Sequence, residues 1–133
     1  MRQFDLGPTP SAELFTAGTL AVVTTYEYAM VTTTYDAEDK AHALAAAVID
    51  GRLAACAQVY PIASVYRWQG RVENEREWRV DFKTRASLVD DLTALIKERH
   101  DYDTPEVIAV PIFTGSPEYL TWIKGETRNE TRN

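Results

Sequence analysis

Apolar and polar residues change their spacing several times along the chain, and each change predicts a new element of secondary structure. The segment 20–35 is rich in Val, Thr and Tyr, which predicts one long or broken first strand. In the next segment, 36–51, apolar residues recur at helical spacing, which predicts a helix. Its narrow apolar face consists of Ala41, Leu44, Ala45, Val48 and Ile49. We expect Asp36 to cap this helix and Gly51 to end it.

Two long strands follow, joined by a tight turn. The segment 53–68 has a strand pattern that Pro61 interrupts, so we expect a bulge or an exposed edge there, because proline has no N–H to donate. Gln69-Gly70 supplies the turn, and apolar and charged residues alternate in 71–84. Each arm exceeds the usual length of about five or six residues. The hairpin should therefore overhang a domain of this size and need another surface to cover it.

Three further elements complete the pattern. We expect Thr84 or Ser87 to cap a second helix, and Ser87 with Asp90 resembles a capping box. The apolar face of that helix consists of Leu88, Leu92, Leu95 and Ile96. The continuous apolar run 107–112 predicts a strand buried on both faces. Ser, Pro and Glu at 116–118 predict the first turn of a last helix.

This order of elements predicts the fold class. Strand, helix, strand, strand, helix and strand, followed by a terminal helix, predict an α+β ferredoxin-like fold: an antiparallel sheet with two helices on one face. The other face needs a cover, and a second copy of the chain is the simplest one. We expect residues 1–27 to form a flexible leader or extension, 28–125 the folded domain and 126–133 a disordered polar tail.

Composition narrows the classes of function. The 133 residues, 45% hydrophobic and 26% charged, fit one globular domain. A net charge of -6 without a basic stripe argues against nucleic acid as a partner. No apolar run reaches about 18 residues and no secretory signal pattern occurs, so we expect no direct membrane insertion. The single cysteine, Cys56, excludes an intramolecular disulfide, and the protein is predicted to be cytoplasmic.

The candidate functional features of this sequence are single residues, not catalytic or metal-binding motifs. The chain has no P-loop, nucleophile elbow, paired-cysteine zinc pattern or acid–base pair, so it is predicted not to be an enzyme. Cys56 is a candidate soft ligand for copper(I), although its small apolar neighbours also fit a buried hydrophobic residue. His100, in a polar loop with nearby carboxylates, is a candidate ligand for copper or zinc. The alternative for His100 is a purely hydrogen-bonding role.

Aromatic and charged residues from several segments could also line a cleft for a small molecule. The candidates are Trp68, Lys83, Tyr102 and Glu106. In the alternative interpretation Trp68 only protects the tip of the hairpin. The sequence alone leaves both interpretations open.

Several runs, in a fixed order over about residues 28–125, resemble the CutA divalent-cation tolerance family. They are RLAAC at 52–56, VYRWQGRVE at 65–73, FKT at 82–84, HDYDTPEV at 100–107 and YLTW at 119–122. The resemblance implies a ferredoxin-like protomer in a tight homotrimer, similar to the nitrogen-regulatory PII proteins. It also implies an association with tolerance of divalent cations, chiefly copper.

The resemblance further implies metal ligands at two places: a cysteine at the end of the first strand and a histidine pair before Tyr-x-x-Pro-Glu. This sequence has Thr33 near the first place and Arg99-His100 at the second. One hypothesis is therefore a response to metal ions through weak binding of copper or another divalent cation, with no obligatory cofactor. A second is a PII-like signalling module that binds a metabolite in clefts between subunits. A third is a structural trimer that anchors an unidentified protein partner.

Overall fold

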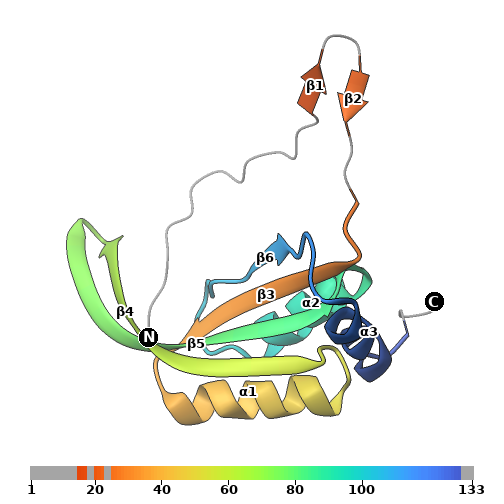
Figure 1. Ribbon diagram of the computed structural model, residues 1–133. Coiled ribbons are helices and arrows are strands. Elements are labelled where there is room, and N and C mark those ends of the chain that lie inside the picture. The colour runs from red at the N-terminus through yellow and green to blue at the C-terminus, as the bar shows by residue number, and fades with distance from the viewer. Residues whose placement is uncertain (1–14, 18–19, 23–24, 130–133) are drawn as a thin grey trace.

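A four-stranded antiparallel sheet forms the centre of the computed structural model, which describes residues 15–17, 20–22 and 25–129. The strands lie in the order β4-β5-β3-β6 (Figure 1). Their bounds are Tyr28–Tyr35 for β3, Cys56–Trp68 for β4, Arg71–Arg85 for β5 and Ile108–Pro111 for β6. Two shorter strands, β1 (Phe15–Ala17) and β2 (Leu20–Val22), pair antiparallel with each other.

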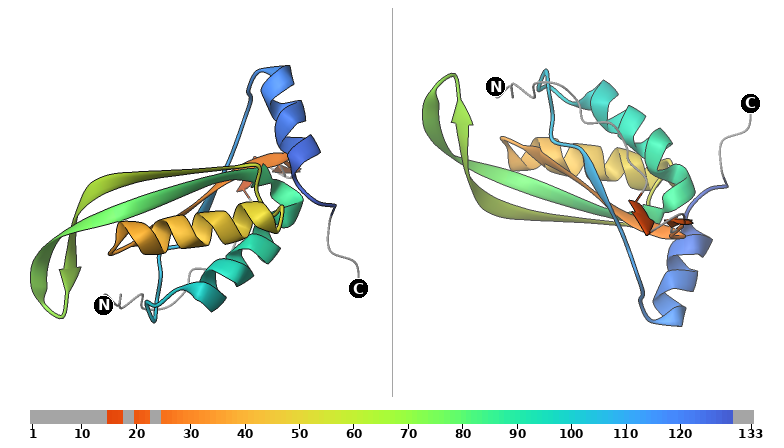
Figure 2. Two further views of the ribbon diagram at one scale, coloured as in Figure 1. Left: turned by 90° about the horizontal axis from the view of Figure 1, so that it is seen from below. Right: turned by 90° about the horizontal axis from the view of Figure 1, so that it is seen from above.

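The helices lie on both sides of this sheet. Their bounds are Glu38–Asp50 for α1, Val89–Arg99 for α2 and Pro117–Glu126 for α3, and the 3-10 turn η1 (Ala86–Leu88) leads into α2. Figure 2 shows α1 and α2 on one face, whereas α3 lies on the opposite side, near the start of β3. The predicted α+β ferredoxin-like order is confirmed. No helix in the described part of the chain is long and apolar enough to cross a membrane.

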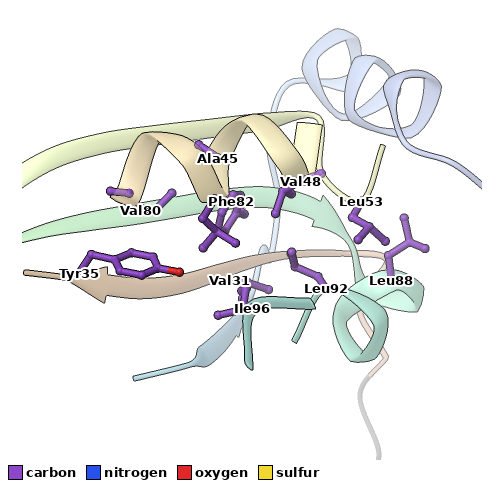
Figure 3. Close-up of a cluster of buried hydrophobic side chains, with 13 residues drawn as sticks. Val31, Tyr35, Ala45, Val48, Leu53, Val80, Phe82, Leu88, Leu92 and Ile96 are labelled. Carbon is purple, nitrogen blue, oxygen red and sulfur yellow. The ribbon is translucent and has the colours of Figure 1, made fainter. Parts of the chain in front are cut away.

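The hydrophobic core fills the space between the sheet and the first two helices. Alternation along β5 points Val80 and Phe82 towards the helices, and both are fully buried. They belong to one cluster with Leu44 and other apolar residues. Figure 3 shows four of these: Val31, Val48, Leu92 and Ile96. The helical spacing identified in α1 therefore describes its buried face, except that Ile49 is 40% exposed.

The long hairpin of β4 and β5 extends beyond the core (Figure 1). Its pairing is continuous from Cys56 opposite Lys83 to Trp68 opposite Arg71. The predicted turn is confirmed: Gln69 and Gly70 have φ of 49° and 78°, and two left-handed residues suit the twist of a two-residue hairpin. Pro61 pairs with Trp78 in unbroken register, so the bulge alternative is wrong. The edge alternative is confirmed, because β4 is an outer strand of the sheet.

Two predicted helix caps are wrong. Ala37 occupies the N-cap of α1, and the Asp36 carboxylate instead accepts a hydrogen bond from Lys40 Nζ at 2.9 Å. The N-cap of α2 is Leu88, whereas Ser87 lies in the preceding 3-10 turn and Thr84 lies in β5. Leu88 is fully buried, and packing of this side chain in the core positions the start of the helix. The cap at Ser116 is confirmed, since its Oγ accepts from Tyr119 N.

The predicted burial of 107–112 on both faces is also wrong. The strand β6 begins at Ile108, and all four of its residues are exposed in the single chain. Ile108 and Val110 pair with Thr32 and Met30 at the edge of the sheet. Because β6 is an outer strand and lies beside β3 only, its apolar run lacks the cover that a central strand would have.

The expected boundaries of the folded domain, at residues 28 and 125, stay a prediction. The first strand of the central sheet is β3, whereas β2 pairs with β1 in a separate sheet, so the two are not halves of one strand. Most of the expected leader 1–27 lies outside the described residues, as does the tail from 130 onward. Thr127, inside the expected tail, is buried, and its hydroxyl accepts a hydrogen bond from Arg85 Nε at 3.0 Å.

Candidate functional site

The loop between α2 and β6 is anchored by a buried imidazole. The His100 side chain has no exposed surface and stacks on Tyr35, with 4.0 Å between the ring centroids and 2° between the planes. Nε2 lies 2.7 Å from the carbonyl oxygen of Thr34, which can only accept. Tyr102 N–H donates to Nδ1 at 3.1 Å. These partners require a neutral ring with its proton on Nε2.

This geometry bears on the candidate metal role of His100. Both ring nitrogens already have partners, so a metal would have to displace either Thr34 or Tyr102. Over the described residues, no group of three or more His, Cys, Asp and Glu side chains is placed to hold a metal ion. Coordination by His100 stays a prediction, and the hydrogen bonds favour the alternative in which this ring organises the loop.

The other candidate ligand, Cys56, is a half-buried free thiol at the first position of β4. It lies opposite Lys83, which in turn lies opposite Met30 of β3. Met30 is four positions before Thr34, a separation of about 13 Å along a strand. One chain therefore does not bring Cys56 and His100 into one site.

Two of the predicted cleft residues lie close together in the loop and attach it to β5. The Tyr102 hydroxyl donates to Glu77 Oε2 at 3.0 Å, and both side chains are buried. Arg79 Nη1 lies 3.9 Å from Glu106 Oε2. Tyr102 and Glu106 thus hold the loop against the strand.

The other two cleft residues lie at opposite ends of the hairpin. Lys83 Nζ donates to Gln58 Oε1 at 2.7 Å and lies 5.7 Å from the centroid of the Tyr119 ring. Trp68 is at the tip, twelve positions along β4 from the partner of Lys83, or about 40 Å of strand. A cleft that contains both Trp68 and Lys83 would need more than one chain, and it stays a prediction.

A hydrogen-bonded cluster around Asp81 was not predicted from the sequence. Asp81 is two positions from Lys83 on β5, so both side chains lie on the same face of the sheet. Asp81 accepts from Thr32 Oγ1 at 2.7 Å, from the Tyr60 hydroxyl at 2.7 Å and from Arg79 Nε at 3.3 Å. Burial alone would raise the pKa of Asp81, but these hydrogen bonds outweigh it and lower the pKa below its ordinary value. Alternation placed Asp81 on a polar face, but only the strand register reveals its partners.

The outer part of this face has apolar residues without cover. We use the name open sheet face for the side chains of β3 to β6 that point away from α1 and α2 between the hairpin tip and α3. Three apolar members are exposed in the single chain: Tyr60 at 38%, Ile108 at 48% and Val110 at 41%. Polar members such as Thr32, Arg79 and Asp81 lie among them.

The fold and the anchored loop place the chain among small α+β proteins with a ferredoxin-like sheet, and comparisons with known proteins then specify the family. Residues 29–126 match the family described as CutA1 divalent ion tolerance protein. The chain therefore belongs to the CutA1 divalent ion tolerance family.

Individual relatives agree with this assignment. The chain is 47% identical over 87 residues to the protein CutA, chloroplastic, of Arabidopsis thaliana, which covers 65% of this chain and 48% of that protein. It is 37% identical over 99 residues to the divalent-cation tolerance protein CutA of Thermus thermophilus, covering 74% and 96%. The crystal structure of CutA1 from Oryza sativa has a TM-score of 0.76 at 42% identity, covering 80% and 98%.

Length and location differ among these relatives. The chain spans about half the length of the Arabidopsis protein and nearly all of the Thermus protein. The name of the Arabidopsis relative assigns that protein to the chloroplast. A cytoplasmic location for this chain stays a prediction.

Proposed function

We propose that this protein acts in divalent-cation tolerance as a homotrimer that binds copper or another divalent cation weakly. The observation that carries the proposal is the open sheet face beside the overhanging hairpin. Exposed apolar residues lie at both places: Ile108 and Val110 on the face, and Val65 and Val72, at 67% and 59% exposure, near the tip. Exposed apolar surface of this kind favours association.

A second copy of the chain is the cover that fits these surfaces. Strands β4 and β6 are the two edges of the sheet, and no other described strand pairs with their outer sides. A hairpin that extends from one chain can contact the open sheet face of another. In an oligomer with closed symmetry, the open sheet face of every copy is then covered in the same way. We propose three copies on the basis of the family resemblance.

Oxygen ligands for a divalent cation are available on the outward side of β5. Glu73 and Glu75 occupy alternate positions, so they share the face that also carries Asp81. Glu77 lies on this face too, but it is buried and accepts from Tyr102. Assembly would bring such carboxylates from different copies closer together, and carboxylates suit hard cations. For copper, the softer candidate ligand is the Cys56 thiol. His100 would serve only if it gave up Thr34 or Tyr102.

Calorimetric titration with a copper salt tests the cation hypothesis. We expect saturable binding, weakened at least about tenfold in Cys56→Ser because a thiolate binds copper far better than a hydroxyl. His42→Ala is the matched control, since this imidazole is exposed on α1 and should contribute nothing. No saturable heat from the wild-type protein would contradict the hypothesis. Equal binding by His100→Ala would exclude His100 as a ligand.

A PII-like metabolite site is the second candidate function. The observation that favours it is the separation of Trp68 from Lys83, because only a neighbouring chain can bring a hairpin tip to the other end of the sheet. In such a cleft Trp68 would stack on a ligand, while Lys83, Tyr102 and Glu106 would supply polar contacts. A thermal-shift screen with nucleotides and small anions tests this idea. If no compound shifts the melting temperature of a protein that binds copper saturably, the metabolite site is excluded.

A further inference from the structure

A cavity opens on the helix-covered side of the sheet, away from the open sheet face. It lies between the first half of α1 and the end of α2 and has a volume of about 240 Å³. Drug-sized ligands occupy cavities of about 300 Å³ upward, so this one would suit a smaller molecule. Its lining combines apolar with charged residues: Tyr35, Lys40, Ala43, Leu44, Arg99 and Asp101.

Tyr35 lines the cavity, and its hydroxyl group can donate a hydrogen bond. Tyr35 is 3% exposed and belongs to the hydrophobic cluster drawn in Figure 3. Its ring stacks on His100, but within the described residues its hydroxyl has no hydrogen-bond partner. Burial raises the pKa of Tyr35 to about 12 and Asp101 adds to this effect, whereas Arg99 and Lys40 oppose it. The hydroxyl is therefore protonated at neutral pH and can donate to an acceptor.

The charges at the rim of the cavity balance, and Arg99 is the cation there that has no ion-pair partner in the described part of the chain. Lys40 Nζ lies 2.9 Å from Asp36 Oδ1 and 2.6 Å from Asp101 Oδ2, so this ammonium group already serves two carboxylates. Arg99 is exposed at the end of α2 and forms no ion pair with the described residues. Its charge offsets the single negative charge left over by Asp36, Lys40 and Asp101. A guanidinium group in this position can bind a carboxylate through two parallel hydrogen bonds.

Apolar contacts complete the site. Leu44 is 2% exposed and lines the cavity together with Tyr35. Ala43 lies on the outer side of α1, where its small side chain leaves the space open. A short hydrocarbon chain would lose contact with water against these groups.

We propose that this cavity binds a small carboxylate with a short aliphatic chain, its carboxylate paired with Arg99 and the Tyr35 hydroxyl and its chain against Ala43 and Leu44. A carboxylate supplies acceptors to these two donors, neither of which has a partner among the residues that the structure describes. The length of the aliphatic part is limited by the volume of the cavity. This inference is independent of the copper and metabolite sites proposed above, because it uses none of their residues and lies on the other side of the sheet.

Sodium butyrate is the probe for this site, followed by amide chemical shifts of the full-length protein in NMR. We expect saturable shifts at residues 43, 44 and 99. Butylammonium and 1-butanol, which keep the chain but not the anionic group, should bind at least about tenfold more weakly. Equal binding of butylammonium, or the absence of saturable shifts with butyrate, would overturn the proposal.

Substitutions distinguish butyrate binding at this cavity from a general effect of the protein's charge. Arg99→Gln should weaken butyrate binding at least about tenfold, and Tyr35→Phe roughly fivefold, because each removes one donor. Lys97→Gln is the control for Arg99, since it removes the same charge from the same turn of α2 without lining the cavity. Ala43→Leu should fill the cavity and abolish binding, whereas the same change at the exposed Ala46 should not. Unchanged binding by both Arg99→Gln and Ala43→Leu would exclude the site.

Discussion

The two faces of the β-sheet are formed by the same strands, but they differ in whether helices of the same chain cover their apolar side chains. On the helix side, Val80 and Phe82 of β5 are fully buried against α1 and α2. On the open sheet face, Tyr60, Ile108 and Val110 keep between 38% and 48% of their surface exposed. A single chain thus satisfies one face by itself and leaves the other available for association. Substitutions on the first face should cost folding stability, and those on the second should change assembly.

Phe82→Ala should give the largest loss of stability. The side chain is fully buried, and removing it creates a cavity in the centre of the core, which typically costs about 3–5 kcal/mol. Urea unfolding followed by circular dichroism measures this loss. Phe113→Ala is the matched control, since Phe113 is 82% exposed and should lose less than about 0.5 kcal/mol. Similar losses in both variants would contradict the assignment of Phe82 to the core.

Tyr102→Phe should give the next largest loss, about 1–3 kcal/mol. The change removes a donor from the Glu77 carboxylate, which is 1% exposed and poorly reached by water. Tyr119→Phe, at a 40% exposed ring, is the control and should be nearly neutral in the same unfolding experiment. A neutral Tyr102→Phe would mean that the loop between α2 and β6 does not depend on this hydrogen bond.

Asp81→Asn should cost about 1 kcal/mol at neutral pH, because an amide accepts less strongly from Thr32 and Tyr60. The cost should depend on pH in a defined direction. The folded-state pKa of Asp81 lies below its ordinary value of 3.8, so the carboxylate stabilises the fold above that pH and loses this contribution as the pH falls through the folded-state pKa. Unfolding of both proteins from pH 7 downward checks this. A difference between them that grows in acid would contradict the assignment.

Ile108→Lys should have the smallest effect on the stability of one chain and the clearest effect on assembly. Ile108 is 48% exposed, so the substitution should cost less than about 0.5 kcal/mol within the protomer. In a trimer that covers this residue, the new charge would be desolvated and the oligomer should dissociate. Light scattering after gel filtration measures the mass, and Ile49→Lys on the exposed side of α1 is the control. A mass equal to one chain for the wild-type protein would refute the assembly itself.

The sequence predicted best what depends on local periodicity. Alternation in β5 identified Val80 and Phe82, helical spacing identified Leu44 and Val48, and Gln69-Gly70 identified the turn. These signals depend on neighbours in sequence, and the structure retains them.

Features that depend on distant partners were predicted poorly. The apolar run of β6 resembles a central strand, but the run does not specify that this strand lies at an edge of the sheet. The contacts of His100 come from Tyr35 and Thr34, and those of Asp81 from Thr32 and Tyr60, which only the tertiary fold brings near. The expected caps at Asp36 and Ser87 were displaced because an ion pair with Lys40 and the burial of Leu88 compete with local capping.

The strand order also has a consequence for the rate of folding. β4 and β5 are joined by a two-residue turn, so their pairing closes almost no loop and can form early. β3 instead pairs Tyr28 with Arg85 and Ala29 with Pro111, and each pairing brings together segments more than 50 residues apart in sequence. High contact order of this kind slows folding. We therefore expect the rate-limiting barrier to lie in the docking of β3 between its two neighbours, after the hairpin has formed.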